Sequence, residues 1–306
     1  MSLWAADDVG AGDDGAVNLN SLRQRAGDAL FARVAGPDGP AARDRIHNAP
    51  GPRWFAEGSP VRIVHGDASM FVGGMRALLL QSLHPAAMAA VAAHSGYRGD
   101  PWGRLARTST FLAVTTFGTI DDATAAIDRV RRVHEHIRGV TAEGLEYFAG
   151  DPTLLRWVHV AEVDSFLRTH RAYGQRPLDA AGADEYVAQA SRVAIALGAE
   201  RVPESVAELA KALAEFRPDL GPSTAAREAA DFLLHEPPVP RTLRPGYTLL
   251  ARAAVASMPP WSFELLGLHR PGRAGSVAAR TGGSVATRSI RWMLGPDDAS
   301  RVSVAR

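Results

Sequence analysis

Residues 121–140, DDATAAIDRVRRVHEHIRGV, predict an amphipathic helix with a histidine on its apolar face. Ile127, Val130 and His134 recur at helical spacing and therefore share one side of that helix. His136 lies two residues further on, a rotation of roughly 200°, and falls on the opposite side. The side chain of His134 is thus expected to face inward. A buried imidazole needs either a hydrogen-bond partner or a metal, and this segment leaves both open.

The composition is that of a soluble globular protein. Of the 306 residues, 46% are hydrophobic and 22% are charged, and the formal net charge is +1. A net charge so close to zero gives no field that attracts nucleic acid, so no nucleic-acid partner is expected. Cysteine is absent, which excludes disulfides, thiolate metal sites and cysteine nucleophiles. Lys211 is the only lysine, so a phosphate-binding GxxxxGK loop is excluded as well.

Two observations bear on the location of the protein. The first residues, MSLWAADDVGAGDDGA, are acidic and lack the apolar core of a signal peptide. The most apolar stretch, residues 77–93, is interrupted by Gln81, His84 and Pro85 and is too polar for a membrane-spanning helix. We therefore expect a cytoplasmic protein without a membrane span.

The pattern of caps and breakers predicts an all-α fold. Asp100 before Pro101 and Asp151 before Pro152 are start signals for two long helices. Residues 61–65 are the only strand candidate, and neither strand–helix alternation nor an internal repeat is visible. We expect an N-terminal arm, residues 1–60, packed on a single helical domain, residues 61–306. Further helices are expected at residues 22–34, 184–197, 203–216, 223–234, 247–258 and 284–294, together with two segments that follow Gly73 and Gly74 and are separated at Pro85.

Several polar side chains fall on faces that should be buried. Besides His134, the side chains of His159 and His84 are expected to face inward. All three can be explained without a function, as core imidazoles bonded to backbone carbonyls. Arg104 and Thr108 share one face of the helix that starts at Pro101 and make that face unusually polar.

Most catalytic motifs are absent. The sequence has no GxSxG nucleophile elbow and no HExxH zinc motif. His159 and Glu162 form a single pair in reversed order, not the two ExxH motifs of a di-iron bundle. Haem requires less, namely one neutral imidazole on a buried helix, an apolar envelope and a few polar groups on the opposite side. His134, the apolar helices and the face that carries Arg104 and Thr108 meet these requirements.

Four blocks carry a more specific signal: GGMRALLLQSLHP, DPWGRLARTSTFLAVTTFG, RVRRVHEHIRG and DPTLLRWVHVAEVDSFL. Together they resemble the family of latex clearing proteins, the rubber oxygenases, and the related mpaB-type oxygenases. The resemblance runs from about Gly73 to Trp261. It implies an all-helical protein with a globin-like core that binds haem b.

The resemblance also implies the site residues. Arg104, Arg107 and Thr108 match a family signature on the distal side of the haem, and His134 matches the proximal iron ligand. Arg107 stands where the best-known rubber oxygenases have a lysine. A guanidinium stays protonated in proteins and is a poorer iron ligand than an amine.

One departure concerns the substrate. The rubber oxygenases have a distal glutamate ahead of the arginine signature, whereas no Asp or Glu occurs between Arg76 and Gly99. Cleavage of polyisoprene by their route is therefore not expected. We expect a haem b-dependent oxygenase that uses dioxygen on a small apolar substrate. The alternatives are a non-catalytic haem-binding or gas-sensing protein that uses the same His134, and a helical protein without cofactor.

Overall fold

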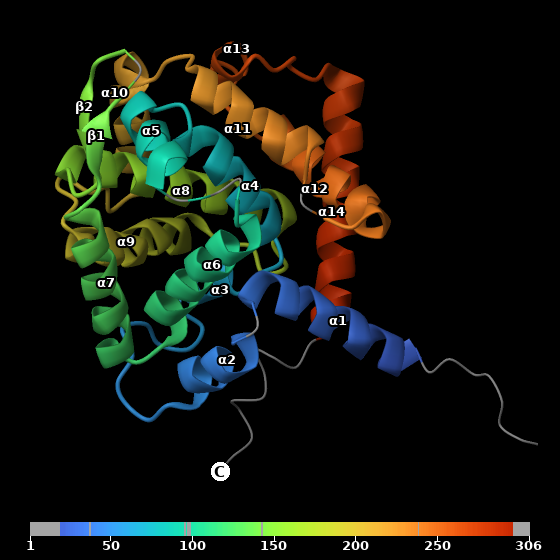
Figure 1. The fold of residues 1–306 in the computed structure, drawn as a ribbon. Helices are drawn as coiled ribbons and strands as arrows, with labels where there is room; N and C mark the ends of the chain where they lie inside the picture. The colour runs from blue at the N-terminus through green and yellow to red at the C-terminus, as the bar shows by residue number, and fades with distance from the viewer. Residues whose placement is uncertain are drawn as a thin grey trace, which may run out of the picture.

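The computed structural model describes residues 19–36, 38–94, 96, 99–141, 143–237 and 239–295. Within these ranges the chain is helical apart from one two-stranded sheet, which confirms the all-α prediction (Figure 1). The α-helices are α1 (Leu19–Ala35), α2 (Gly39–Asn48), α3 (Pro60–His65), α4 (Met70–Gln81), α5 (Pro85–His94), α6 (Pro101–Phe117), α7 (Ile120–His134), α8 (Pro152–Tyr173), α9 (Ala180–Leu197), α10 (Val206–Glu215), α11 (Thr224–His235), α12 (Arg244–Ala256), α13 (Ser262–Leu266) and α14 (Arg273–Leu294). The strands are β1 (Arg138–Val140) and β2 (Glu146–Phe148), and two short 3-10 helices are η1 (Arg217–Asp219) and η2 (Arg241–Leu243).

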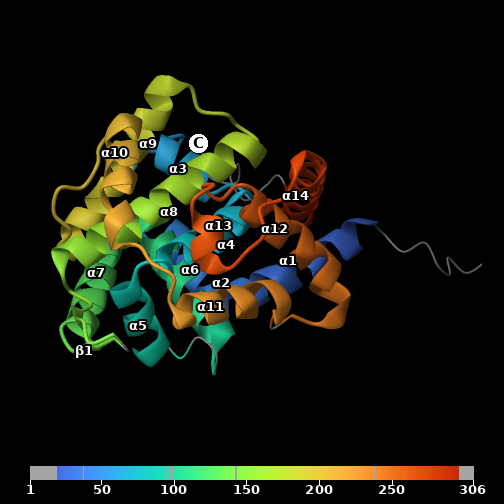
Figure 2. The ribbon, with the colours of Figure 1, turned by 90° about the horizontal axis from the view of Figure 1, so that it is seen from above.

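Helix α8 lies in the middle of the molecule, with other helices on every side (Figures 1 and 2). Its start follows the predicted signal, because the Asp151 side chain accepts hydrogen bonds from the backbone N–H groups of Thr153 and Leu154, and Pro152 occupies the first turn. Most of its side chains are buried, including those on opposite faces. It is therefore the helix against which the others are packed.

Helix α4 crosses α8 at very short range because a glycine faces it. A Cβ atom on Gly73 would lie 2.7 Å from Oγ1 of Thr169 and 2.9 Å from Cδ1 of Phe166. No side chain fits into that gap, and the two backbones approach accordingly. Gly74, one residue on, has no atom within 4 Å of the corresponding position.

A buried ion pair joins the same two helices. Arg76 of α4 has no accessible surface, and its Nη2 lies 2.7 Å from Oδ2 of Asp164 on α8. The guanidinium also donates to Oγ of Ser165 at 2.6 Å and to the carbonyl of Ser257, just after α12, at 3.0 Å. One cation thus ties together three helices that are far apart in the sequence.

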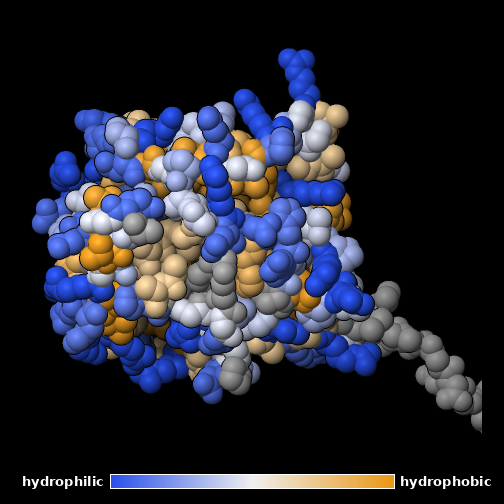
Figure 3. Space-filling view, turned by 45° about the horizontal axis from the view of Figure 1, so that its top comes forward, coloured by the Kyte–Doolittle hydropathy of each residue, from blue (hydrophilic) through white to orange (hydrophobic). Residues whose placement is uncertain are grey.

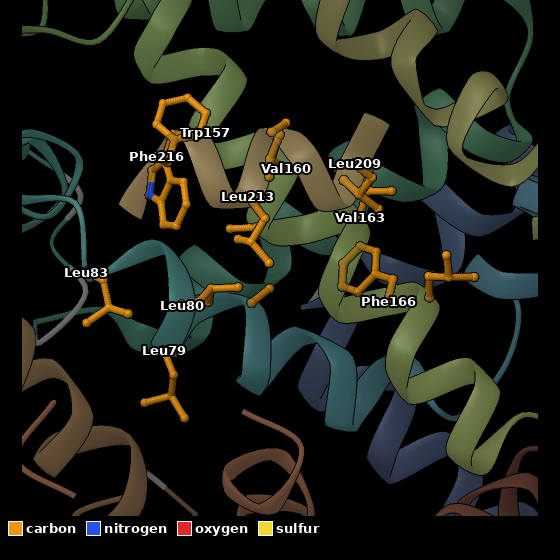
Figure 4. Close-up of a cluster of buried hydrophobic side chains, with 14 of the residues drawn as sticks. Leu79, Leu80, Leu83, Trp157, Val160, Val163, Phe166, Leu209, Leu213 and Phe216 are labelled. Atoms are coloured by element: carbon orange, nitrogen blue, oxygen red, sulfur yellow. The ribbon is translucent and has the colours of Figure 1, made fainter. Parts of the chain in front are cut away.

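The main hydrophobic core lies where α4, α8 and α10 meet (Figure 4). Trp157 is fully buried at its centre, its ring in an edge contact with Phe216 at 5.2 Å. The indole N–H donates to the carbonyl of Gln81, so the polar atom of this large side chain is satisfied. A contact of this kind adds about 0.5–1.5 kcal/mol to the gain from burying the rings.

Helix α14 packs closely against α12 because a glycine lies at the contact, as it does between α4 and α8. A Cβ on Gly283 would lie 2.6 Å from the Cβ of Ala253 and 2.9 Å from the ring of Tyr173. Helix α1 packs on α6 and α14, on the side of the molecule away from α7 (Figures 1 and 2). The division of the chain at residue 60 stays a prediction, and residues 1–18 lie outside the described part.

The starts of two helices that contain glycines were predicted wrongly. Gly73 and Gly74 do not precede a helix but lie inside α4, and α14 begins at Arg273 rather than near residue 284. Gly283 lies inside α14, where helix packing requires a residue without a side chain. The break at Pro85 between α4 and α5 is confirmed.

The strand predictions were also wrong. Residues 61–65 form the helix α3, and the observed strands β1 and β2 follow α7 as an antiparallel hairpin. Strands of three residues are too short for alternation to be visible in a sequence. The hairpin packs on α5, where the Tyr147 hydroxyl lies 3.3 Å from Nε2 of His94.

In the described part of the chain, no single helix is long and apolar enough to span a membrane. Helices α4 and α5 meet the length and hydropathy criteria only as a pair, and they are bent by 108° relative to each other.

The neighbouring glycines of α4 provide a matched test of the close contact with α8. Gly73→Ala should lower the free energy of unfolding by about 1–3 kcal/mol, because its methyl group overlaps Thr169 and Phe166. Gly74→Ala should raise it by up to about 1 kcal/mol, because alanine favours the helix and meets no atom. Urea unfolding midpoints measure both effects. Equal effects of the two substitutions would contradict the predicted contact.

Candidate functional site

Helices α6 and α7 form a hairpin whose two arms diverge from their connection (Figure 1). Helix α6 begins sharply at Asp100, whose carboxylate accepts a hydrogen bond from the backbone N–H of Gly103. Arg104 on α6 and His134 at the end of α7 each lie about four helical turns from the connection between the two helices. They therefore occupy the two free ends of a V-shaped pair.

His134 is half-buried, and burial lowers its pKa below the usual value. The imidazole is therefore neutral at neutral pH. Within the described ranges, its ring nitrogens make no hydrogen bond or ion pair. His136 is exposed, and its Nδ1 donates to the carbonyl of Arg132 at 2.7 Å, which confirms that the two histidines lie on different sides of the chain. A neutral imidazole with open nitrogens has the chemistry of a metal ligand.

The three predicted distal residues lie together on the first turns of α6. Arg104 is half-buried. Arg107 is exposed and forms an ion pair with Asp100 at 3.3 Å, while exposed Thr108 donates to the carbonyl of Arg104 at 3.0 Å. In the described part of the chain, the hydrogen bonds of Arg107 and Thr108 stay within α6 and its cap. Their assignment to one site stays a prediction.

A buried polar cluster that the sequence analysis missed lies between α3, α6 and α9. Nδ1 of His65 is 2.8 Å from Oγ1 of Thr116, and Nε2 is 3.3 Å from the hydroxyl of Tyr186. Burial lowers the pKa of His65 to about 3, so this imidazole is neutral too. Burial and the nearby carboxyl of Glu162 raise the pKa of Tyr186 well above its usual value. The only sequence signal was a histidine in a segment interpreted as a strand.

Helix α8 adds two titratable groups one turn apart. Burial lowers the pKa of His159 to about 4 and raises that of Glu162 to about 7. Nε2 of His159 is buried without a hydrogen-bond partner. Glu162 is deep enough in the protein for this shift but retains accessible surface.

Part of the apolar surface of α5 and α6 is not fully buried. Helix α5, PAAMAAVAAH, is hydrophobic on all sides, yet only Ala87 and Met88 of its ten residues are buried. Leu112 and Val114 in the middle of α6 are half-buried. Figure 3 shows several hydrophobic patches between hydrophilic residues on the face that carries α5. Helices of this composition normally lie in a closed core.

These residues fit a haem group. The described residues contain no group of three or more His, Asp or Glu side chains arranged to hold a metal ion. Haem iron takes four of its ligands from the porphyrin and needs only one or two from the protein. His134 offers one neutral nitrogen, and the uncovered apolar surface of α5 and α6 suits a flat macrocycle.

Residues 62–292 match the family described as ER-bound oxygenase mpaB/B′ and rubber oxygenase, catalytic domain. The chain belongs to this family. The resemblance seen in the four sequence blocks is therefore confirmed, and the protein carries the catalytic domain of an oxygenase family.

Two further proteins are similar to part of this mpaB/rubber oxygenase family member. Uncharacterized proteins of Mycobacterium bovis and Mycobacterium tuberculosis are each 34% identical to it over 107 residues. The match covers 35% of this chain and 40% of either relative, so it spans less than half the length of the curated relatives. No solved structure matches the chain.

The buried histidine of α8 predicts how stability depends on pH. Between pH 6.5 and about 4, His159 is protonated in the unfolded chain but neutral in the folded protein. Protonation of His159 in the unfolded chain therefore lowers the free energy of unfolding as the pH falls, by up to about 1.4 kcal/mol per pH unit. His159→Leu should remove this contribution and flatten the pH dependence over that interval, as measured by urea unfolding.

The matched control is His269→Leu, which removes an imidazole from the surface. A change in slope as large as that of His159→Leu would contradict the assignment of the effect to burial.

Proposed function

We propose that this protein is a haem b-dependent oxygenase that uses dioxygen on a small apolar substrate. Three findings support this proposal: the family, the neutral imidazole of His134 and the uncovered apolar surface of α5 and α6. His134 carries the most weight, because an imidazole kept neutral and left without a partner has no evident structural role.

In this proposal His134 holds the haem iron through one ring nitrogen. The other nitrogen would be left to donate to a water molecule, which would fix the tautomer and the orientation of the ring. The bound haem supplies the redox chemistry that activates dioxygen. The chain itself orients the reactants and keeps bulk water away from them.

Arg104 and Thr108 provide hydrogen-bond donors on the other arm of the α6–α7 hairpin. Arg104 is half-buried and permanently charged, so it favours negative charge that develops on oxygen. Arg107 pairs with Asp100, the residue that caps α6, and its guanidinium cannot lose its proton to bind iron. It stays in the proposal as a member of the distal group with Arg104 and Thr108.

The absorption spectrum of the purified protein tests the cofactor and its ligand. Protein expressed with ample haem should show a Soret band, and His134→Ala should lose at least most of it because the iron loses its protein ligand. His136→Ala is the matched control, since this exposed histidine lies on the other side of the chain and should leave the band intact.

Two outcomes would overturn parts of this proposal. Haem-free wild-type protein would exclude the cofactor. Loss of the band in His159→Ala, with the band kept in His134→Ala, would move the ligand to the buried nitrogen of α8.

The rate of dioxygen consumption tests the role of Arg104. With a chemical reductant present, Arg104→Ala should keep its Soret band and consume dioxygen about a hundredfold more slowly, because a donor to developing negative charge is lost. Arg131→Ala, at an exposed position of α7, is the control. A wild-type protein that binds carbon monoxide but consumes no dioxygen would favour the non-catalytic gas-binding alternative.

A further inference from the structure

Helix α14 carries a row of large apolar side chains that face solvent. Val277, Val285 and Trp292 are 67%, 51% and 53% exposed, and we call these three residues the apolar row. At 100° per residue they fall within an arc of about 80° and extend over about 22 Å of the helix. The helix lies along one edge of the molecule, opposite α7 (Figures 1 and 2).

Contacts on the other side of α14 fix the direction in which this row points. Gly283 lies against Ala253 and the ring of Tyr173 too closely for any side chain. Nε and Nη2 of Arg291 donate to the two carboxylate oxygens of Asp67, at 3.1 Å and 2.9 Å. Nη2 of Arg291 also donates to the carbonyl of Tyr173. Because these contacts hold one face of the helix inward, the apolar row is held outward.

The same helix is strongly basic. It has four arginines and no Asp or Glu among its 22 residues. Arg273, Arg280 and Arg288 are exposed, and in the ranges that the structure describes their guanidinium groups form no hydrogen bond or ion pair. The whole chain has 34 basic and 33 acidic residues, whereas residues 239–295 have eight arginines and a single acid, Glu264. Positive charge is therefore concentrated in the part of the chain that carries the apolar row.

A polar cavity lies beside the row. It has a volume of about 490 Å³ and is placed between the end of α8 and α14. Its lining includes Gln175, Ser284 and Arg288, which offer an amide, a hydroxyl and an unpaired guanidinium. Arg288 lies one helical turn before Trp292, so the cavity opens next to the apolar row. Donors of this kind suit a phosphate group.

This combination favours an anionic lipid surface over a second copy of the chain. A symmetric dimer would bring α14 against itself, and its exposed arginines would meet without any carboxylate on either helix. Helices that lie in the membrane interface combine apolar and aromatic side chains on one side with arginines beside them. Tryptophan is enriched at the boundary between lipid and water, and arginine clusters on amphipathic helices bind anionic lipids.

We propose that α14 lies flat on a surface of anionic phospholipids. The apolar row inserts between the headgroups, the three unpaired arginines pair with phosphates, and one headgroup phosphate enters the cavity beside Arg288. This contact is peripheral and does not require a membrane-spanning helix. It goes beyond the proposed oxygenase function and does not depend on haem, but it would bring the protein to the layer in which a small apolar substrate dissolves.

Cosedimentation of the full chain with lipid vesicles tests the surface. The protein should bind vesicles of phosphatidylcholine that contain about a third phosphatidylserine, and at least about tenfold more weakly those of phosphatidylcholine alone. Binding should decrease as salt is added, because exposed charges are screened over shorter distances at higher ionic strength.

A pair of arginine substitutions tests the charge on α14. Arg280→Gln combined with Arg288→Gln should weaken binding to the phosphatidylserine vesicles about 25-fold, or about fivefold for each arginine. The matched control is Arg129→Gln combined with Arg132→Gln, which removes the same charge from exposed positions of α7, at the opposite edge of the molecule. This control should lose less than about a third of that factor.

A single substitution tests the apolar row. Val285→Asp should weaken binding at least about tenfold, because a carboxylate would have to enter the lipid layer. Ile195→Asp is the control, since Ile195 of α9 is 52% exposed, almost the same as Val285 at 51%. Both positions are exposed, so the urea unfolding midpoints of the two variants should stay close to that of the wild type.

Three outcomes would overturn the proposal. The first is a wild-type protein that does not bind the phosphatidylserine vesicles at low ionic strength. The second is an equal loss of binding in the α14 and α7 arginine pairs. The third is a wild-type dimer that Val285→Asp dissociates, without vesicle binding, which would assign the apolar row to a second copy of the chain. Since none of these measurements uses the Soret band, they are independent of the haem proposal.

Discussion

The packing of this protein depends on one buried cation. Arg76 has no accessible surface, and it is stable there because Asp164, Ser165 and the carbonyl of Ser257 surround it with acceptors. Removing one member of such a pair typically costs about 3–5 kcal/mol, since the other charge stays buried. The requirement fixes how α4 crosses α8 and where α12 ends, and the glycine contact between α4 and α8 follows from the same crossing.

That crossing divides the carboxylates of α8 into two kinds. Asp164 faces α4 and is neutralised by Arg76, so it serves the fold. Glu162, two residues earlier, points to the other side, where burial raises its pKa and no cation compensates it. A helix that is buried on most sides can hold one neutralised and one uncompensated carboxylate within one turn, because the two sides have different neighbours.

The sequence predicted what depends on local chemistry and missed what depends on distant partners. Caps are local, so the starts of α6 and α8 at Asp100 and Asp151 were predicted correctly. The contact of Gly283 with Ala253 joins two helices that are distant in the sequence, and α14 was predicted too short. In the site, periodicity separated His134 from His136, but it could not show that His65 meets Thr116 and Tyr186 from two other helices.

The β-hairpin after α7 has a mechanical consequence. Helix α7 ends at His134, the chain then enters β1, and the hairpin packs on α5, where Tyr147 contacts His94. The imidazole of His134 therefore lies where helix α7 ends and a β-hairpin that packs on the apolar helix α5 begins. A molecule that displaced α5 on binding would also displace the β-hairpin. This displacement would reach His134 without passing through the core around Trp157.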